Sequence, residues 1–183
     1  MGSLSTDIRR ERCEMKRYYV AFYRGTGDWA DRIVRFATRS AYSHCELIWS
    51  ETRPKLGATV ECLSASRRDG GVRLKQIELK PAKWCVYDVT WAPDGTWDRA
   101  ADKLGAPYEL WSLVTTHLFN FRRGDRDRWF CSELIAYALR LDMPHAYSPG
   151  DLLRAIRDHS DTYDAGRRAA CANVWDDTRG LDA

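Results

Sequence analysis

The residue type best suited to nucleophilic chemistry is Cys131, in the segment WFCSELI (129–135). It follows a charged loop, and the apolar residues after it predict a helix over 130–141. The first N–H groups of a helix lack intrahelical partners and carry a partial positive charge. Both properties lower the pKa of a thiol and favour the reactive thiolate, and the same N–H groups can bind the oxyanion of an attacked carbonyl. The alternative is a buried cysteine packed under Phe130 and Leu134.

A thiolate enzyme also needs a base, and the chain has four histidines. His44 falls in a predicted strand, 43–49, and a rigid strand suits the geometry that nucleophile activation requires. His117 falls in an apolar stretch, which is typical of a packed histidine, while His145 falls in a loop and His159 near the tail. His44 is therefore the expected base.

The imidazole of His44 needs a third group to orient it. Glu46 follows two residues later on the same strand face, so its side chain projects parallel to the ring. Glu61 falls in the next predicted strand, 58–63, and neighbouring antiparallel strands bring side chains within about 5 Å of each other. We expect Glu61 to orient the ring, and Glu46 is the alternative.

Two different halves of the chain must position these residues. Aromatic, β-branched and alternating runs in the first half predict strands at 18–23, 43–49, 58–63, 72–79 and 84–89, with a helix from Asp28 to Thr38 after the first. Apolar periodicity in the second half predicts helices at 97–104 and 130–141 and from Pro149 to Ile156, besides an apolar stretch at 108–121. We expect an α+β fold in which an antiparallel sheet or open barrel packs against the apolar face of the 130–141 helix (Leu134, Ile135, Ala138). That packing would bring Cys131 beside His44.

A chain of 183 residues is expected to form one domain with a core that needs no disulfide or metal. We expect a polar arm at 1–17, a catalytic domain at 18–157 and a C-terminal extension at 158–183. The 29 basic and 26 acidic residues are too balanced for a typical nucleic-acid binder.

Targeting and metal signals are also missing from the sequence. No run of eighteen apolar residues predicts a transmembrane segment, and residues 1–17 contain no apolar core of a signal peptide. Synthesis in the cytoplasm is therefore expected. The six cysteines form no C-x-x-C pair, so neither a metal nor another cofactor is expected.

Six short motifs, taken in chain order, resemble a known family. They are Ser-His-x-Glu (43–46), Val-Glu (60–61), Gly-Gly (70–71), Gly-x-Pro-Tyr (105–108), Phe-Cys-Ser-Glu-Leu (130–134) and Ser-Pro-Gly-Asp-Leu (148–152). The pattern resembles the permuted NlpC/P60 superfamily, specifically the YiiX/YebB-like branch of papain-like cysteine hydrolases, over roughly residues 18 to 156. In ordinary members the Cys helix precedes the His strand, whereas here the His strand comes first.

The resemblance implies a circularly permuted papain-like fold, with Cys131 as nucleophile, His44 as base, Glu61 as orienting residue and no cofactor. Tyr108 resembles a tyrosine that ordinary members carry near the substrate carbonyl. The other oxyanion or substrate-binding candidates are Ser43, Tyr42 and Ser132. The related lecithin–retinol acyltransferase group carries Asn-Cys-Glu-His around its nucleophile. This chain has Phe-Cys-Ser-Glu there, which argues against a lipid acyltransferase.

Relatives in this superfamily commonly cleave amide bonds in peptidoglycan stem peptides. The resemblance thus implies a cysteine endopeptidase or amidase of the cell wall, as in an antibacterial effector or a phage protein, and the arginine-rich loop 122–128 suits carboxylate-bearing substrates. Such a chain would reach the periplasm or wall by a secretion system, phage lysis or a virion, with a delivery or immunity protein as partner.

Two other functions remain open. One is a thioesterase, acyltransferase or amidase acting on a lipid or acyl-protein, which an apolar channel beside Cys131, built from residues such as Trp111 or Phe119, would favour. The other is a catalytically inactive binding module with the same fold.

Overall fold

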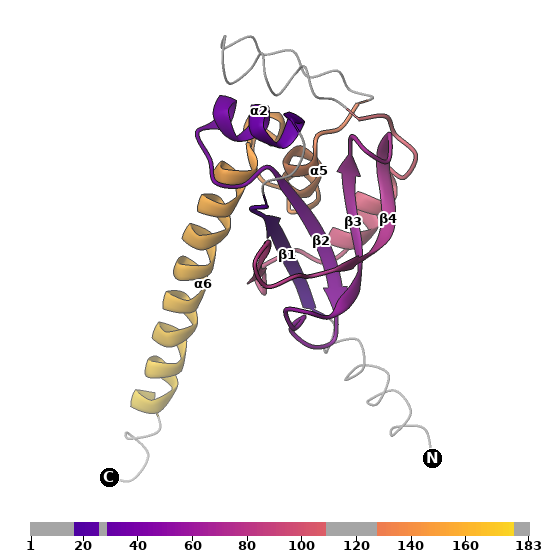
Figure 1. The fold of residues 1–183 in the computed structure, drawn as a ribbon. Helices are drawn as coiled ribbons and strands as arrows, with labels where there is room; N and C mark the ends of the chain where they lie inside the picture. Colours follow the sequence, from indigo (N-terminus) through magenta and orange to yellow (C-terminus); the bar gives the residue numbers. More distant parts are fainter. Residues whose placement is uncertain (1–16, 26–28, 109–127, 178–183) are drawn as a thin grey trace, which may run out of the picture.

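A computed structural model describes residues 17–25, 29–108 and 128–177 (Figure 1). The elements in chain order are β1 (Arg17–Tyr23), α2 (Trp29–Thr38), β2 (His44–Ser50), β3 (Thr59–Ser66), β4 (Gly71–Glu78), β5 (Trp84–Asp88), α3 (Thr96–Ala101), α5 (Cys131–Ala138), the 3-10 helix η1 (Pro144–Ala146) and α6 (Pro149–Asp177). Apart from α2, strands come first and helices follow. The fold class is therefore α+β, as the sequence predicted.

The five strands form one antiparallel, open sheet in the order β4-β3-β2-β1-β5. In this sheet β1 pairs with both β2 and β5, and β3 pairs with both β2 and β4. Consequently β4 and β5 form the two edges. The sequence left open an antiparallel sheet or an open barrel, and the described strands form an open antiparallel sheet.

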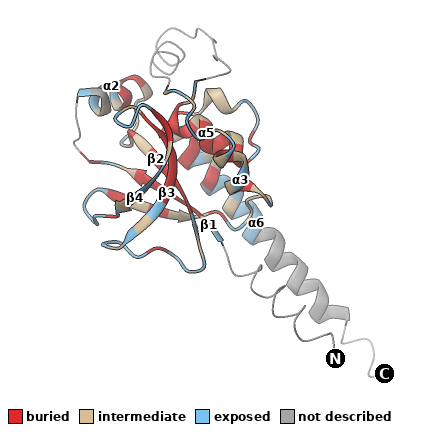
Figure 2. Cartoon of the chain, turned by 90° about the vertical axis from the view of Figure 1, so that its right-hand side faces the viewer, coloured by how far each residue is buried: buried red, intermediate tan, exposed pale blue. Residues whose placement is uncertain are grey.

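The helix α5 covers one face of the sheet (Figures 1 and 2). Its residues Leu134, Ile135 and Ala138 are fully buried, as expected from their spacing. They share a core with alternate residues of the three central strands, among them Val20, Phe22, Cys45, Leu47 and Leu63. Because strand side chains alternate between faces, the residues in between form a second cluster on the opposite face, which includes Ala21, Ile48 and Cys62. The strands are buried on both faces near their centres.

The last helix is longer than predicted. We expected it to end near Ile156, where the apolar periodicity ends, but α6 continues to Asp177 and extends away from the sheet (Figure 1). Its first two turns supply Leu152, Leu153 and Ile156 to the core. The next turns still contact the body of the protein, because the His159 ring stacks on Trp91 and the Trp91 indole donates to the Ser160 hydroxyl at 3.1 Å. These contacts are polar or aromatic, so they leave no apolar stripe from which a longer helix could be predicted. The predicted domain boundary at 157–158 therefore falls inside one helix.

Most of the other predicted elements lie within three residues of the observed ones, and β3 continues to Ser66 instead of ending at residue 63. Several predictions concern residues outside the described ranges: nearly all of the 1–17 arm, the 108–121 stretch with His117, Trp111 and Phe119, and the 122–128 loop. Among the described helices, none has the length and apolar character needed to cross a membrane.

Candidate active site

Cys131 is the first residue of α5. Phe130 before it has extended backbone angles (φ −96°, ψ 155°), and its N–H donates to the Glu133 carboxylate at 3.4 Å. The first intrahelical bond of α5 runs from the Leu134 N–H to the Phe130 carbonyl. Cys131 thus has the helix N-terminal position that its sequence context predicted, among N–H groups with no partner earlier in the helix. Its side chain is fully buried.

The packing of α5 on β2 brings Cys131 together with His44. Burial opposes ionisation of the thiol, but hydrogen bonds from Cys45 and His44, together with the charge of His44, prevail and lower the pKa of Cys131 to about 5. Burial also opposes protonation of His44, but the thiolate of Cys131 and the carboxylate of Glu46 raise the pKa of the ring to about 10. These shifts have opposite signs, so the stable form at neutral pH is a thiolate–imidazolium pair.

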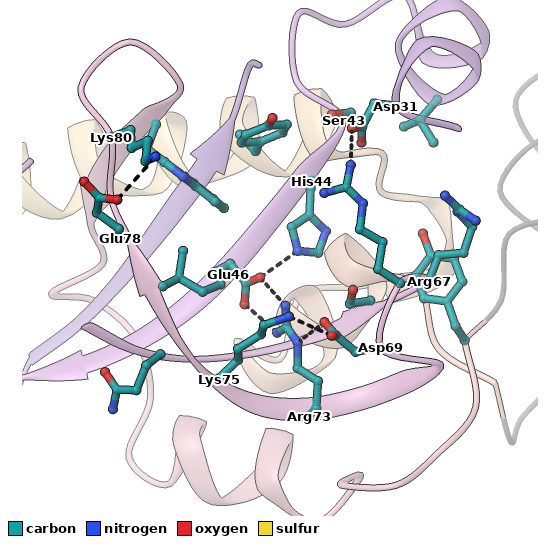
Figure 3. Close-up of a pocket in the computed structure, with 18 residues that line it drawn as sticks. Asp31, Ser43, His44, Glu46, Arg67, Asp69, Arg73, Lys75, Glu78 and Lys80 are labelled. Atoms are coloured by element: carbon teal, nitrogen blue, oxygen red, sulfur yellow. Dashed lines mark hydrogen bonds and ion pairs between the residues drawn. The ribbon is translucent and has the colours of Figure 1, made fainter. Parts of the chain in front are cut away.

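Glu46 is the carboxylate that bonds His44 (Figure 3). Its Oε1 lies 2.7 Å from Nε2 of the ring, and both of its oxygens accept hydrogen bonds from the Arg73 guanidinium, at 2.6 and 2.8 Å. Glu46 is fully buried. Burial alone would raise its pKa, but the charges and hydrogen bonds of His44 and Arg73 lower it. The buried carboxylate is therefore held ionised against the imidazolium.

The expectation that Glu61 orients His44 is wrong. Leu47 pairs with Leu63 in the antiparallel β2–β3 ladder, so His44 lies opposite Ser66 and Glu61 lies opposite Trp49. Five residues along a strand correspond to about 16 Å. The odd offset also places Glu61 on the other face of the sheet, where its side chain is exposed. The alternative from the sequence, Glu46, occupies the orienting position.

Arg73 connects Glu46 to a second carboxylate on the turn between β3 and β4. Its Nε donates to Asp69 at 2.9 Å, and Lys75 donates to the other oxygen of Asp69 at 2.7 Å (Figure 3). Burial of Asp69 is outweighed by these hydrogen bonds, which hold its pKa well below the usual range. A continuous series of charged groups therefore links His44 to the surface through Glu46, Arg73 and Asp69.

Two of the glycine motifs position Tyr108 beside the nucleophile. Gly70 has a positive φ of 83°, and a Cβ on Gly71 would collide with the Ala106 carbonyl. The close approach lets the Tyr108 N–H bond the Gly70 carbonyl at 3.2 Å, and Tyr108 also bridges Trp129. The Tyr108 ring packs on that of Phe130, with centroids 5.7 Å apart. Burial and the charge of Cys131 raise the pKa of Tyr108 well above its ordinary value, so it is a hydroxyl donor.

The other three candidates have different positions. Ser43 is buried and lines the pocket next to His44, and no partner for its hydroxyl is found among the described residues. The Tyr42 hydroxyl instead contacts Cys85 and Tyr87 on β5. The Ser132 hydroxyl is fully buried and donates to the Tyr147 carbonyl at 2.5 Å, which ties α5 to the end of η1. Ser43 and Tyr108 therefore lie where a substrate would bind, whereas the side chains of Tyr42 and Ser132 are engaged in packing and tethering.

A pocket of about 390 Å³ lies over the sheet face that bears His44, Glu46 and Arg73. Ten of its eighteen lining residues are Asp, Glu, Arg, Lys or His: Asp31, His44, Glu46, Arg67, Arg68, Asp69, Arg73, Lys75, Glu78 and Lys80. Cys131 is not itself a lining residue, although its neighbours His44 and Tyr108 are. The thiol is thus adjacent to a pocket that carries many charged side chains beside aromatic and aliphatic ones, but it is covered in this conformation.

Sequence reasoning missed two residues that touch this array. Arg73 falls at a polar position of an alternating strand, a pattern that is typical of a solvent-facing side chain. Its position on the pocket face depends on the sheet register. Cys45 faces α5 and hydrogen-bonds the Cys131 thiol, and a lone buried cysteine between His44 and Glu46 gave no signal of that contact. Within the described ranges, no group of three or more potential metal ligands lies together.

Two comparisons with known proteins found no match. The chain matches no protein-family model, and no curated protein matches it.

Proposed function

We propose that this protein is a cysteine hydrolase in which Cys131 is the nucleophile, His44 the general acid and base, and Glu46 the orienting carboxylate. The observation that carries this proposal is the buried array of a thiol at a helix N-terminus, an imidazole bonded to it, and an ionised carboxylate 2.7 Å from the far ring nitrogen. Nucleophile, base and orienting group are the three roles that covalent acyl transfer requires.

The reaction begins with attack of the Cys131 thiolate on a substrate carbonyl carbon. The resulting oxyanion accepts a hydrogen bond from the N–H of Cys131, with the hydroxyls of Tyr108 and Ser43 as further donors. His44 gives its proton to the leaving amine, which departs and leaves a thioester on Cys131. His44 then takes a proton from water, the hydroxide attacks the thioester, and release of the carboxylic acid restores the thiolate–imidazolium pair.

The pocket favours a hydrophilic amide over an acyl chain. An acyl-chain channel would have few charged side chains in its lining. This pocket has Tyr23, Val34, Ile77, Trp84 and Tyr108 in its lining, but paired cations and carboxylates make up the larger part of the lining residues. Alternating charges suit a peptide-like substrate that carries both carboxylates and amines. We therefore place the amidase or endopeptidase function ahead of the thioesterase or lipid acyltransferase alternative.

The finer assignment is part of the same proposal. The Ser-His strand, the Gly-x-Pro-Tyr and Phe-Cys-Ser-Glu-Leu motifs, and their order along the chain are consistent with a permuted papain-like fold of the NlpC/P60 type. On that basis the proposed substrate is a peptidoglycan stem peptide. The proposed setting is an effector or phage protein that a delivery system carries to the wall.

Thiol labelling tests the catalytic pair. Iodoacetamide alkylation is followed over a pH series in the wild type and in His44→Ala, with mass spectrometry to identify the modified cysteine. We expect Cys131 to react selectively well below the ordinary thiol pKa of about 8.5, and His44→Ala to abolish that selectivity. Because Cys131 is buried, a small reagent should react faster than a bulky one at every pH. Labelling of Cys131 no faster than the other cysteines, and independent of His44, would favour the inactive binding module.

Digestion of purified peptidoglycan tests the substrate, with Cys131→Ala as the inactive control. We expect soluble stem-peptide fragments with the wild type alone. Intact peptidoglycan after prolonged exposure to a thiol-reactive enzyme would refute the substrate assignment while leaving the catalytic pair in place, and acyl esters would then be the next class of substrate to test.

A further inference from the structure

The helix α2 carries three large apolar side chains that are exposed to solvent, although the Arg67 guanidinium lies over the Trp29 ring, 5.2 Å from its centroid. Trp29, Ile33 and Phe36 are 60%, 38% and 80% exposed. Their spacing, four residues and then three, places them on one face of the helix. The adjoining side of the helix is occupied, because Val34 and Ala37 are buried against the body of the protein. Phe36 and Trp29 are the two most exposed large apolar side chains in the described part of the chain.

Basic side chains flank this face. Arg32 and Arg39 are exposed, and the Arg35 guanidinium donates to the Gly25 carbonyl at 2.9 Å. The one carboxylate of α2, Asp31, lies on the pocket side of the helix, where Arg68 donates to it at 3.3 Å. The exposed face therefore combines aromatic and aliphatic groups with positive charge and has no acidic residue of its own.

We propose that this face of α2 (Trp29, Ile33 and Phe36), together with Arg32 and with Arg39 directly after the helix, docks on an anionic membrane surface. A helix with Trp and Phe on its apolar side and arginines beside it is the form that lies in the lipid headgroup region, with its arginines against lipid phosphates. A second copy of the chain is a poorer partner for this face, because a symmetric dimer would bring the arginines of the two copies together and they would repel each other.

Docking through α2 would also affect the pocket that contains His44, because α2 forms part of its lining. Asp31 and Val34, on the other side of the helix, line the pocket that contains His44. A docked α2 would hold this pocket at the membrane surface and present it to hydrophilic groups displayed there. This consequence, unlike the docking itself, rests on the proposed hydrolase function.

Vesicle sedimentation of the full chain tests the docking. The Cys131→Ser variant is used as the background so that binding is measured without any thiolate chemistry. We expect it to sediment with vesicles that contain phosphatidylglycerol, to sediment little with phosphatidylcholine alone, and to be released by added salt because the arginine contacts are screened. Ile33→Ser combined with Phe36→Ser should weaken binding at least about tenfold, since two apolar side chains no longer enter the lipid. Arg32→Glu combined with Arg39→Glu should abolish the preference for anionic vesicles.

Leu56→Ser is the matched control. Leu56 is 48% exposed in the loop between β2 and β3, at the far end of β2 from His44, and its substitution should leave binding unchanged. If all variants have the same midpoint of thermal unfolding, a loss of vesicle binding is not caused by a loss of folding. The proposal is overturned if neither vesicle type binds, if the double serine variant binds as the parent does, or if that variant instead abolishes a dimer seen in solution. Vesicle binding by a protein whose Cys131 shows no enhanced reactivity would retain the docking and refute the hydrolase.

Discussion

A hydrogen bond of 2.7 Å joins Nε2 of His44 to Oε1 of Glu46, two residues further along the same strand. Side chains at this spacing usually project in parallel, with about 6 to 7 Å between their Cα atoms. Here the ring spans that separation, and the bidentate contact from Arg73 fixes the carboxylate on its other side. One strand therefore supplies both the proposed base and its orienting group, and the neighbouring α5 supplies the proposed nucleophile.

Replacement of Glu46 should weaken the thiolate. Glu46→Gln removes the buried negative charge that supports the His44 imidazolium, so the midpoint of Cys131 alkylation should move up by about one pH unit or more. The pH series of iodoacetamide labelling measures this shift. Glu61→Gln is the matched control, because Glu61 is exposed on the opposite face of the sheet. An equal shift in both variants, or a shift in Glu61→Gln alone, would contradict the assignment of Glu46.

Activity and thiol reactivity should share the same acid limb in their dependence on pH. Below about pH 5 the Cys131 thiolate takes up a proton, and above about pH 10 the His44 imidazolium loses one. We therefore expect kcat/KM on the substrate to be bell-shaped, rising through about pH 5 and falling through about pH 10. Alkylation, which needs only the thiolate, should show the acid limb. An alkylation midpoint near the ordinary thiol value would show that the pair is not ionised.

Cys45 should act on the thiolate through its hydrogen bond. Cys45→Ala removes a donor to Cys131, so the alkylation midpoint of Cys131 should rise. Cys62→Ala provides the control, because Cys62 is equally buried but on the other face of the sheet, where its thiol approaches the Val60 carbonyl. Both variants lose a similar buried volume and should lose similar stability, so only the midpoint distinguishes them. An unchanged midpoint in Cys45→Ala would show that this contact does not tune the nucleophile.

Removal of Arg73 should destabilise the fold. Arg73→Leu leaves Glu46 fully buried with His44 as its one remaining cationic partner, and breaking a buried ion pair in this way costs about 3 to 5 kcal/mol. Urea unfolding measures the loss. Arg73→Lys retains the charge without the bidentate geometry and should lose less.

The comparison for Arg73 is Lys75→Leu. Lys75 bonds the same Asp69, but its side chain is half exposed, so its loss should cost no more than about 1 kcal/mol. Equal losses for Arg73→Leu and Lys75→Leu would show that the network stabilises the protein through Asp69 rather than through Glu46.

Local patterns were enough to predict most of the elements and two members of the array. Residues 18–23 and 43–49 read as strands because aromatic and β-branched residues cluster there, and the helix after Phe130 follows from its apolar spacing. The position of Cys131 at the start of that helix is likewise a local property. The turn at Gly70 and Gly71 is local too, because glycine readily adopts the positive φ of 83° that Gly70 has there.

Tertiary structure decided which carboxylate meets the base. Whether Glu46 or Glu61 approaches His44 depends on the register between β2 and β3, and one strand's sequence does not state how far it is shifted against another. The register of β4 against β3, which pairs Arg73 with Ser64, then brings Arg73 into line with Glu46 on the pocket face. The contact of Cys45 with Cys131 and the approach of Tyr108 depend on how α5 and the 106–108 segment pack on the sheet. The sequence alone thus determined the helices and strands and the reactive residue types that they carry, because propensity and periodicity are local properties. Strand register and helix packing determined which of these side chains contact one another, because they bring together residues that are distant in the sequence.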